Sequence, residues 1–135
     1  METRGEFMPA SIEEARELAE RLGPVAQLVI RETAQAMDFD RDEYRERVTA
    51  DVVETARDAL FASLLRVFVG SRSEFDDWLD GRDLAVEEVG SEQVDNVVWH
   101  AFDGTVVAAT FQNEPDAAVS TLRRQAFGRL YKEPL

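Results

Sequence analysis

The 135-residue sequence contains no cysteine, one histidine and one lysine. The absence of cysteine excludes a disulfide scaffold, a thiol nucleophile and any zinc or iron–sulfur site built on thiolates. Lys132, the only lysine, lies close to the end of the sequence, which disfavours Schiff-base chemistry. A glycine-rich phosphate loop and the Gly-x-Ser-x-Gly nucleophile elbow are also missing. This inventory predicts no catalytic, cofactor-binding or metal-binding residues and favours a non-enzymatic protein.

Long apolar runs are absent as well. No segment has the length and apolar character of a membrane span, and the first residues form neither the basic nor the apolar region of a signal peptide. We therefore expect a cytoplasmic protein with no membrane association. A chain of this length is expected to fold as one domain, residues 1–135.

Acidic residues dominate the charge. The formal net charge is −13, and the 15 basic residues are all arginine except Lys132. Such a chain repels itself at low ionic strength, whereas concentrated salt screens the repulsion. Arginine is also more weakly hydrated than lysine and pairs with carboxylates through two hydrogen bonds. We interpret this composition as that of a halophilic protein that requires high salt for stability. The alternative is an acidic surface that binds a basic partner.

The segment 97–111 is the centre of the predicted fold. Two β-branched and aromatic runs flank Asp103-Gly104, a dipeptide typical of a type I′ hairpin turn. This turn pairs Phe102 with Thr105 and, further from the turn, His100 with Val107 and Trp99 with Ala108. Both faces of the hairpin are apolar. It must therefore be covered on both sides, either by helices of its own chain or by another chain.

The remaining periodicity predicts an α+β fold with a mixed, mainly antiparallel sheet of about four strands. The helices are expected at about 11–22, 24–37 and 41–59, with a short helix at 73–80 and a C-terminal helix at 115–131. The strands are expected at 61–69, 84–89, 97–102 and 105–111. Gly23-Pro24 is expected to end one helix and begin the next. The segment 48–51 is a second candidate break, and the helix before the first strand is alternatively extended to about Leu64. The first two strands are candidates for a parallel pair.

His100 and Trp99 are the first two candidate interaction residues. His100 is either a general base, a proton switch or a metal ligand, or else a hydrogen-bonded and inert histidine at a sheet margin. Trp99 is either part of the core under the N-terminal helices or an anchor at a subunit contact. Aspartates at 38, 40 and 42 imitate the start of a calcium loop, but the residues that follow do not fit it. Helix capping explains these aspartates better.

The last helix reverses the charge of the chain. It carries four further candidate residues, Arg123, Arg124, Arg129 and Lys132. These cations indicate either a surface for nucleic acid or an acidic protein, or a helix C-terminus stabilised by basic residues.

Three segments carry a resemblance to a known family. The runs 52–65, 96–100 and 120–131 are Val-Val-Glu-Thr-Ala-Arg-Asp-Ala-Leu-Phe-Ala-Ser-Leu-Leu, Asn-Val-Val-Trp-His and Ser-Thr-Leu-Arg-Arg-Gln-Ala-Phe-Gly-Arg-Leu-Tyr. They resemble a family of small haloarchaeal proteins of unknown function. The resemblance spans the chain and implies no activity, cofactor or site residue.

Two functional hypotheses follow. The first is a non-enzymatic interaction or assembly protein, a homodimer or a subunit of a heteromeric complex, that uses the Trp99 face or the arginine-rich last helix. The second is a nucleic-acid-associated regulatory protein that uses the basic residues of that helix. A small enzyme that works through His100 is a third and weaker alternative.

Overall fold

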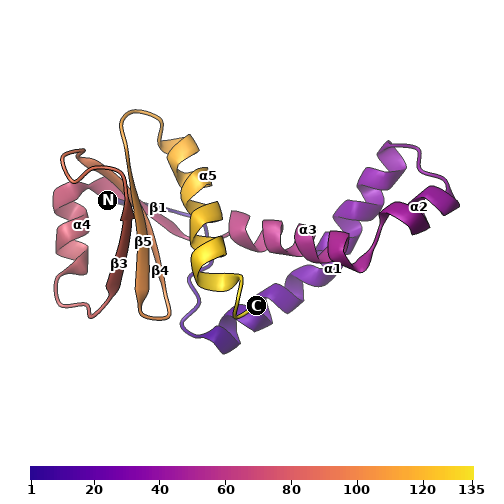
Figure 1. Cartoon of the computed structure of the whole chain (residues 1–135), viewed down its shortest axis with the longest axis horizontal. Coiled ribbons are helices and arrows are strands. Elements are labelled where there is room, and N and C mark those ends of the chain that lie inside the picture. Colours follow the sequence, from indigo (N-terminus) through magenta and orange to yellow (C-terminus); the bar gives the residue numbers. More distant parts are fainter.

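The computed structural model describes all residues 1–135 and shows an α+β protein with a five-stranded mixed sheet. Figure 1 shows a layered body at one end, with α4 on one face of the sheet and α5 on the other, and a helical extension that leaves the body. In chain order the elements are β1 (Glu2–Arg4), α1 (Ile12–Ala36), α2 (Arg41–Arg47), α3 (Ala50–Ser63), β2 (Val67–Ser71), α4 (Arg72–Leu79), β3 (Ala85–Val89), β4 (Asn96–Phe102), β5 (Thr105–Phe111) and α5 (Pro115–Ala126), which continues as the π-helix η1 (Phe127–Tyr131). None of the helices is long and apolar enough to cross a membrane.

The predicted hairpin is present as β4 and β5. Phe102 pairs with Thr105, His100 with Val107 and Trp99 with Ala108, so the register agrees with the prediction. Asp103 and Gly104 have φ angles of 51° and 82°. Both central residues are left-handed, as a type I′ turn requires.

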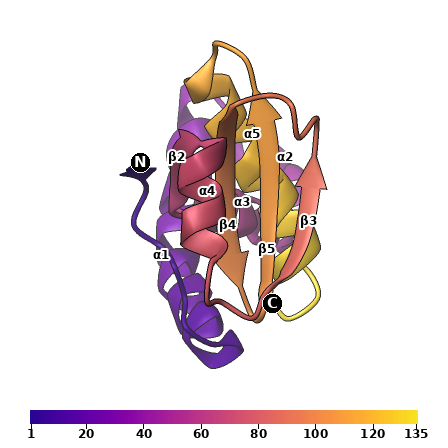
Figure 2. The ribbon, with the colours of Figure 1, turned by 90° about the vertical axis from the view of Figure 1, so that its left-hand side faces the viewer.

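The sheet has the order β1-β2-β4-β5-β3, and Figure 2 shows its strands behind α4. β1 was not predicted, because three residues give no periodic signal. β3 lies at an edge, where its polar pair Glu87 and Glu88 is typical of an edge strand. The predicted parallel pair of the first two long strands is wrong: β2 is antiparallel to β4, and β3 is parallel to β5. The connection from β2 through α4 to β3 therefore passes over the positions of β4 and β5, and β3 joins the sheet at its far edge.

Each face of the sheet has its own hydrophobic core, and the chain's own helices cover both. On one face Phe61, Val98 and Leu122 belong to a cluster that joins β4 and β5 to α1, α3 and α5. On the other face Phe75 and Trp99 belong to a second cluster under α4. Of the two alternatives for covering the hairpin, the structure shows coverage by the same chain.

The predicted break at Gly23-Pro24 is wrong, since α1 runs through both residues. Proline usually ends a helix because its ring collides with the preceding backbone and with the Cβ of the residue before it. Gly23 has no Cβ, so the second collision is removed. Figure 1 shows α1 bending near its middle, as expected when proline removes one backbone hydrogen bond.

Two other boundaries differ from the predictions. The helix expected at 41–59 is divided at the alternative break into α2 and α3, and Thr49 caps the second helix. The strand expected at 61–69 begins only at Val67, while the helix continues to Ser63. Residues 56–66 contain no β-branched side chain and are mostly good helix formers, so the helix continues to Ser63 and the strand begins only at the β-branched Val67. The short helix expected at 73–80 is α4, which begins at Arg72 and is capped by Ser71 through a capping box with Glu74.

The extension is formed by residues 24–58, which we call the helical arm. It contains the second half of α1, all of α2 and most of α3. Only Ala26 and Ala34 are buried in it. The arm therefore has almost no core of its own.

Candidate functional site

His100 lies in the core between β4 and the C-terminal π-helix. Its side chain is fully buried, with Nδ1 2.6 Å from the carbonyl oxygen of Arg66 and Nε2 2.6 Å from the hydroxyl of Tyr131. A carbonyl oxygen only accepts hydrogen bonds, so Nδ1 carries the proton and Nε2 accepts the proton of the Tyr131 hydroxyl. Both ring nitrogens are thus satisfied by a neutral imidazole.

Burial keeps this pair neutral. It lowers the pKa of His100 to about 4, and the hydrogen bond to the Arg66 carbonyl opposes this shift in part. Burial also raises the pKa of Tyr131. The Tyr131 ring stacks on Phe102 at 4.3 Å between centroids and meets Phe61 edge-on at 5.1 Å. His100 is therefore hydrogen-bonded inside the protein, on a central strand rather than at the sheet margin that we expected.

Trp99 points to the opposite face of the sheet and is also fully buried. Its ring lies 4.9 Å from that of Phe75, 5.5 Å from Phe68 and 5.9 Å from Trp78, between ring centroids. The indole therefore belongs to the core, but under α4 and not under the N-terminal helices. It presents no surface to a partner.

Arg123 joins three parts of the body. Its Nε donates to the carbonyl of Leu65 at 3.0 Å and its Nη2 donates to the carbonyl of Arg4 at 3.1 Å. Burial and the nearby Arg4 lower the pKa of Arg123. Gly5 makes room for this contact: it has a φ of 98°, and a Cβ there would lie 2.4 Å from the Leu65 carbonyl oxygen. Arg123 thus holds β1 and the start of β2 against α5.

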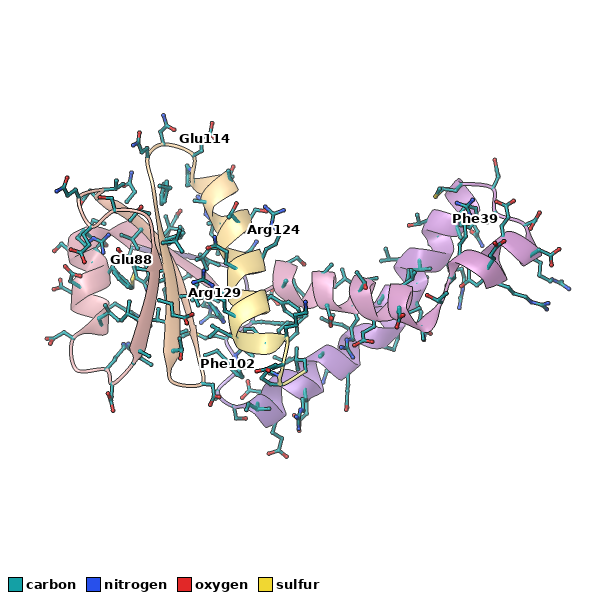
Figure 3. All side chains as sticks on the ribbon, in the orientation of Figure 1. Phe39, Glu88, Phe102, Glu114, Arg124 and Arg129 are labelled. Carbon is teal, nitrogen blue, oxygen red and sulfur yellow. The ribbon has the colours of Figure 1, made fainter.

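The other three basic residues of the C-terminal segment are exposed and lie on two different sides of it. Arg124 and Lys132 line a groove of about 400 Å³ that also contains Asp58 of α3. Arg129 points toward β3, with Nη1 3.9 Å from Glu87 Oε2. Figure 3 labels Arg124 and Arg129 on α5 and its continuation. The predicted basic patch is therefore divided between two sides of this segment.

The acidic residues do not gather into a metal centre. No group of three or more histidine, aspartate or glutamate side chains has an arrangement that could hold a metal ion. Asp40 instead caps α2, where its Oδ1 accepts the backbone N–H of Glu43 at 2.8 Å. The prediction of helix capping is confirmed at this residue.

Sequence reasoning did not identify the pocket at the tip of the helical arm. It has a volume of about 560 Å³ and lies where the chain turns from α1 into α2. Its lining contains Phe39, which Figure 3 labels at the tip, and three arginines, Arg31, Arg41 and Arg45. None of these three guanidinium groups has a carboxylate oxygen within 4.0 Å. Unpaired guanidinium groups can bind carboxylates of another molecule.

The arm also exposes an apolar surface. Val25, Leu28 and Val29 on α1 are 43%, 52% and 45% exposed, and Met37 and Val52 add to them. The spacing of Val25, Leu28 and Val29 is that of one helix face. The sequence pattern revealed the face, but not that it would point away from the body.

A family model matches residues 6–132, which include the arm, the sheet and the C-terminal helix. The chain belongs to the DUF5809 family. The description of this family is "family of unknown function", so membership assigns no role to His100 or to the arginines. Neither the curated proteins nor the solved structures contain a match.

The geometry of this DUF5809 chain thus separates buried and accessible candidates. Trp99, His100 and Arg123 hold the body together. Accessible chemistry lies mainly on the helical arm, where an apolar helix face is close to a group of unpaired arginines.

Proposed function

We propose that this protein is a non-enzymatic interaction or assembly protein of a high-salt cytoplasm and that it binds a partner protein through the helical arm. The observation that carries this proposal is the exposed apolar surface of the arm. Eight large hydrophobic side chains are exposed in the structure, and five of them are on the arm. Contiguous exposed apolar surface is typical of protein interaction sites.

The weak interior of the arm supports the same proposal. Helices in globular proteins gain most of their stability by burying an apolar face against another element. The second half of α1 buries only Ala26 and Ala34, whereas its larger residues Val25 and Leu28 are exposed. A partner on this face would give the arm the packing that its own chain does not supply.

The body offers less to a partner. Both faces of the sheet are covered by helices. The edge strand β3 exposes Val86 and Val89, but it is short and carries Glu87 and Glu88, which discourage pairing with another strand. The interaction hypothesis therefore moves from the Trp99 face to the arm.

The nucleic-acid hypothesis remains a prediction. Arg123 is engaged with backbone carbonyls, and Arg129 lies beside Glu87, which leaves Arg124 and Lys132 as the accessible cations of the last helix. Backbone phosphates are bound by several cations that act together, and a net charge of −13 opposes their approach. The arm therefore supports the protein-interaction hypothesis better.

The test compares two doubly substituted chains. Val25→Glu with Leu28→Glu introduces charge on the arm, and Val86→Glu with Val89→Glu makes a matched change on the edge of β3. Association is measured for the purified full chain by light scattering coupled to size exclusion in concentrated salt, and in cells by crosslinking of the tagged chain. Circular dichroism confirms that each variant is folded.

We expect the arm variant to lose an association that the wild type and the β3 variant keep. If the arm variant keeps every association of the wild type, or if the wild type associates with nothing in either assay, the proposal is wrong.

A further inference from the structure

The exposed face of α1 has a defined pattern of charge. Arg21, Val25, Leu28 and Glu32 follow one another at spacings of four, three and four residues, so they form one stripe along the helix. All four are exposed. Neither Arg21 nor Glu32 forms an ion pair within the chain. The stripe therefore has a free cation at one end, a free anion at the other and apolar side chains between them.

We infer that this stripe binds a second copy of the same chain, with the two α1 helices antiparallel across a two-fold axis near residues 26 and 27. In this alignment Val25 of each copy packs against Leu28 of the other, and Arg21 of each copy meets Glu32 of the other. A two-fold contact uses the same patch on both copies, so the patch must be complementary to itself. This inference rests on the proposed function and names the partner.

The direction of pairing follows from the charges. Two parallel helices in the same register would place Arg21 against Arg21 and Glu32 against Glu32. The antiparallel arrangement replaces both repulsions by ion pairs. Antiparallel pairing of helices is also common in helix bundles, where each helix buries an apolar stripe.

The unpaired arginines at the tip supply a second, independent observation. In an antiparallel pair, the tip of one arm lies beside the first turns of the other copy's α1. Those turns carry Glu13, Glu14, Glu17 and Glu20, and none of these carboxylates forms an ion pair within its own chain. Arg31 projects on the same flank of α1 as Glu13 and Glu20, and in antiparallel helices equivalent flanks face each other. Arg31 of each copy thus lies beside an acidic segment of the other.

The test exchanges charges on the full chain. Arg21→Glu places carboxylates at both ends of the stripe, and Glu32→Arg places guanidinium groups at both ends. Each variant alone is expected to associate at least about tenfold more weakly than the wild type, because both symmetric ion pairs become repulsive contacts. An equimolar mixture of the two variants is expected to form a heterodimer in which both pairs are again attractive. Glu92→Arg and Arg124→Glu, both on the body, change the charge by the same amounts outside the proposed contact and serve as controls.

Association is measured by analytical ultracentrifugation at the lowest salt concentration in which the chain stays folded, since salt screens surface charges. Differently labelled variants show whether the mixture contains the heterodimer. Recovery in the mixture, with unchanged association of the two controls, supports the antiparallel contact. A wild type that stays monomeric overturns the inference, and so does a mixture that associates no better than its separate components. If the wild type is monomeric but the arm variant of the preceding section loses a different protein in cells, the proposed function holds and only the second copy is refuted.

Discussion

Acidification should destabilise the protein through its only histidine. The imidazole of His100 is buried and neutral, with a pKa of about 4, whereas the pKa of a solvent-exposed histidine in an unfolded chain is about 6.5. Below pH 6.5 the unfolded chain therefore binds a proton that the folded chain does not take up until about pH 4. Stability rises with pH wherever the unfolded state binds more protons. The contribution of His100 is therefore complete above pH 6.5 and is lost as the pH falls toward 4.

The magnitude follows from the difference between the two pKa values. The difference between a pKa of about 4 in the folded chain and about 6.5 in the unfolded chain corresponds to about 3 kcal/mol of unfolding free energy. About 2.5 kcal/mol of this is lost by pH 4.5, at a slope that approaches about 1.4 kcal/mol per pH unit. This loss is a substantial fraction of the about 5–15 kcal/mol that stabilises an ordinary domain.

Denaturant unfolding at constant salt between about pH 7.5 and about pH 4.5 measures this slope. His100→Asn is the reference, because its amide can still donate to the Arg66 carbonyl but does not titrate. The variant starts from a lower unfolding free energy. Between pH 6.5 and 5, however, its unfolding free energy should fall less steeply with decreasing pH than that of the wild type, by the slope that one bound proton contributes. The ring resonance of this single histidine gives an independent midpoint by NMR. Parallel curves for the two proteins, or a midpoint near 6.5 in the folded chain, would refute the reasoning.

Two further substitutions test the contacts that hold the body together, each by the unfolding free energy and against a matched control. Tyr131→Phe keeps the stacked ring but leaves His100 Nε2 without a hydrogen-bond donor, so we expect the unfolding free energy to fall by about 1–3 kcal/mol. The control is Tyr44→Phe, at a half-buried tyrosine without a side-chain hydrogen bond. Its unfolding free energy should stay within about 0.5 kcal/mol of the wild type. Arg123→Gln removes the guanidinium from two backbone carbonyls and should cost about 2 kcal/mol, whereas Arg124→Gln in the exposed groove should again change stability by less than about 0.5 kcal/mol. Equal losses in a variant and its control would contradict the assigned contact.

The parts of the fold that could be predicted are those set by local interactions. The turn at Asp103-Gly104 and the alternation on either side of it determine the β4–β5 register without help from the rest of the chain. The approximate positions of most helices followed from apolar periodicity in the same way. The pairing of β3 with β5 could not be predicted, because a short edge strand carries no signal that names its neighbour.

The candidate site was less predictable, because its contacts join distant segments. His100 and Tyr131 are separated by 31 residues, and no local pattern in the sequence indicates that they are in contact. The arginines of the last helix formed one group in the sequence, yet Arg123 binds backbone carbonyls in the body and Arg129 approaches β3. Conversely, Arg31, Arg41 and Arg45 formed no visible group, because only the turn from α1 into α2 brings them together.

The exposed apolar side chains of the arm allow an estimate of the free energy with which two copies associate. α1 turns alanines toward its neighbours and exposes Val25, Leu28 and Val29, which are about half exposed. Burying such a side chain completely stabilises by about 1.5–3 kcal/mol, so covering the exposed halves of six of them in two copies contributes about 4–9 kcal/mol. Association itself costs about 4–15 kcal/mol in lost freedom of motion. These apolar side chains alone therefore offset at most the lower part of that cost, and the net affinity must come from the contacts around them. The two ion pairs between Arg21 and Glu32, and the contact of Arg31 with the other copy's acidic first turns, are therefore decisive: if they form, the dimer is stable at moderate concentration, and if they do not, two such acidic chains stay apart.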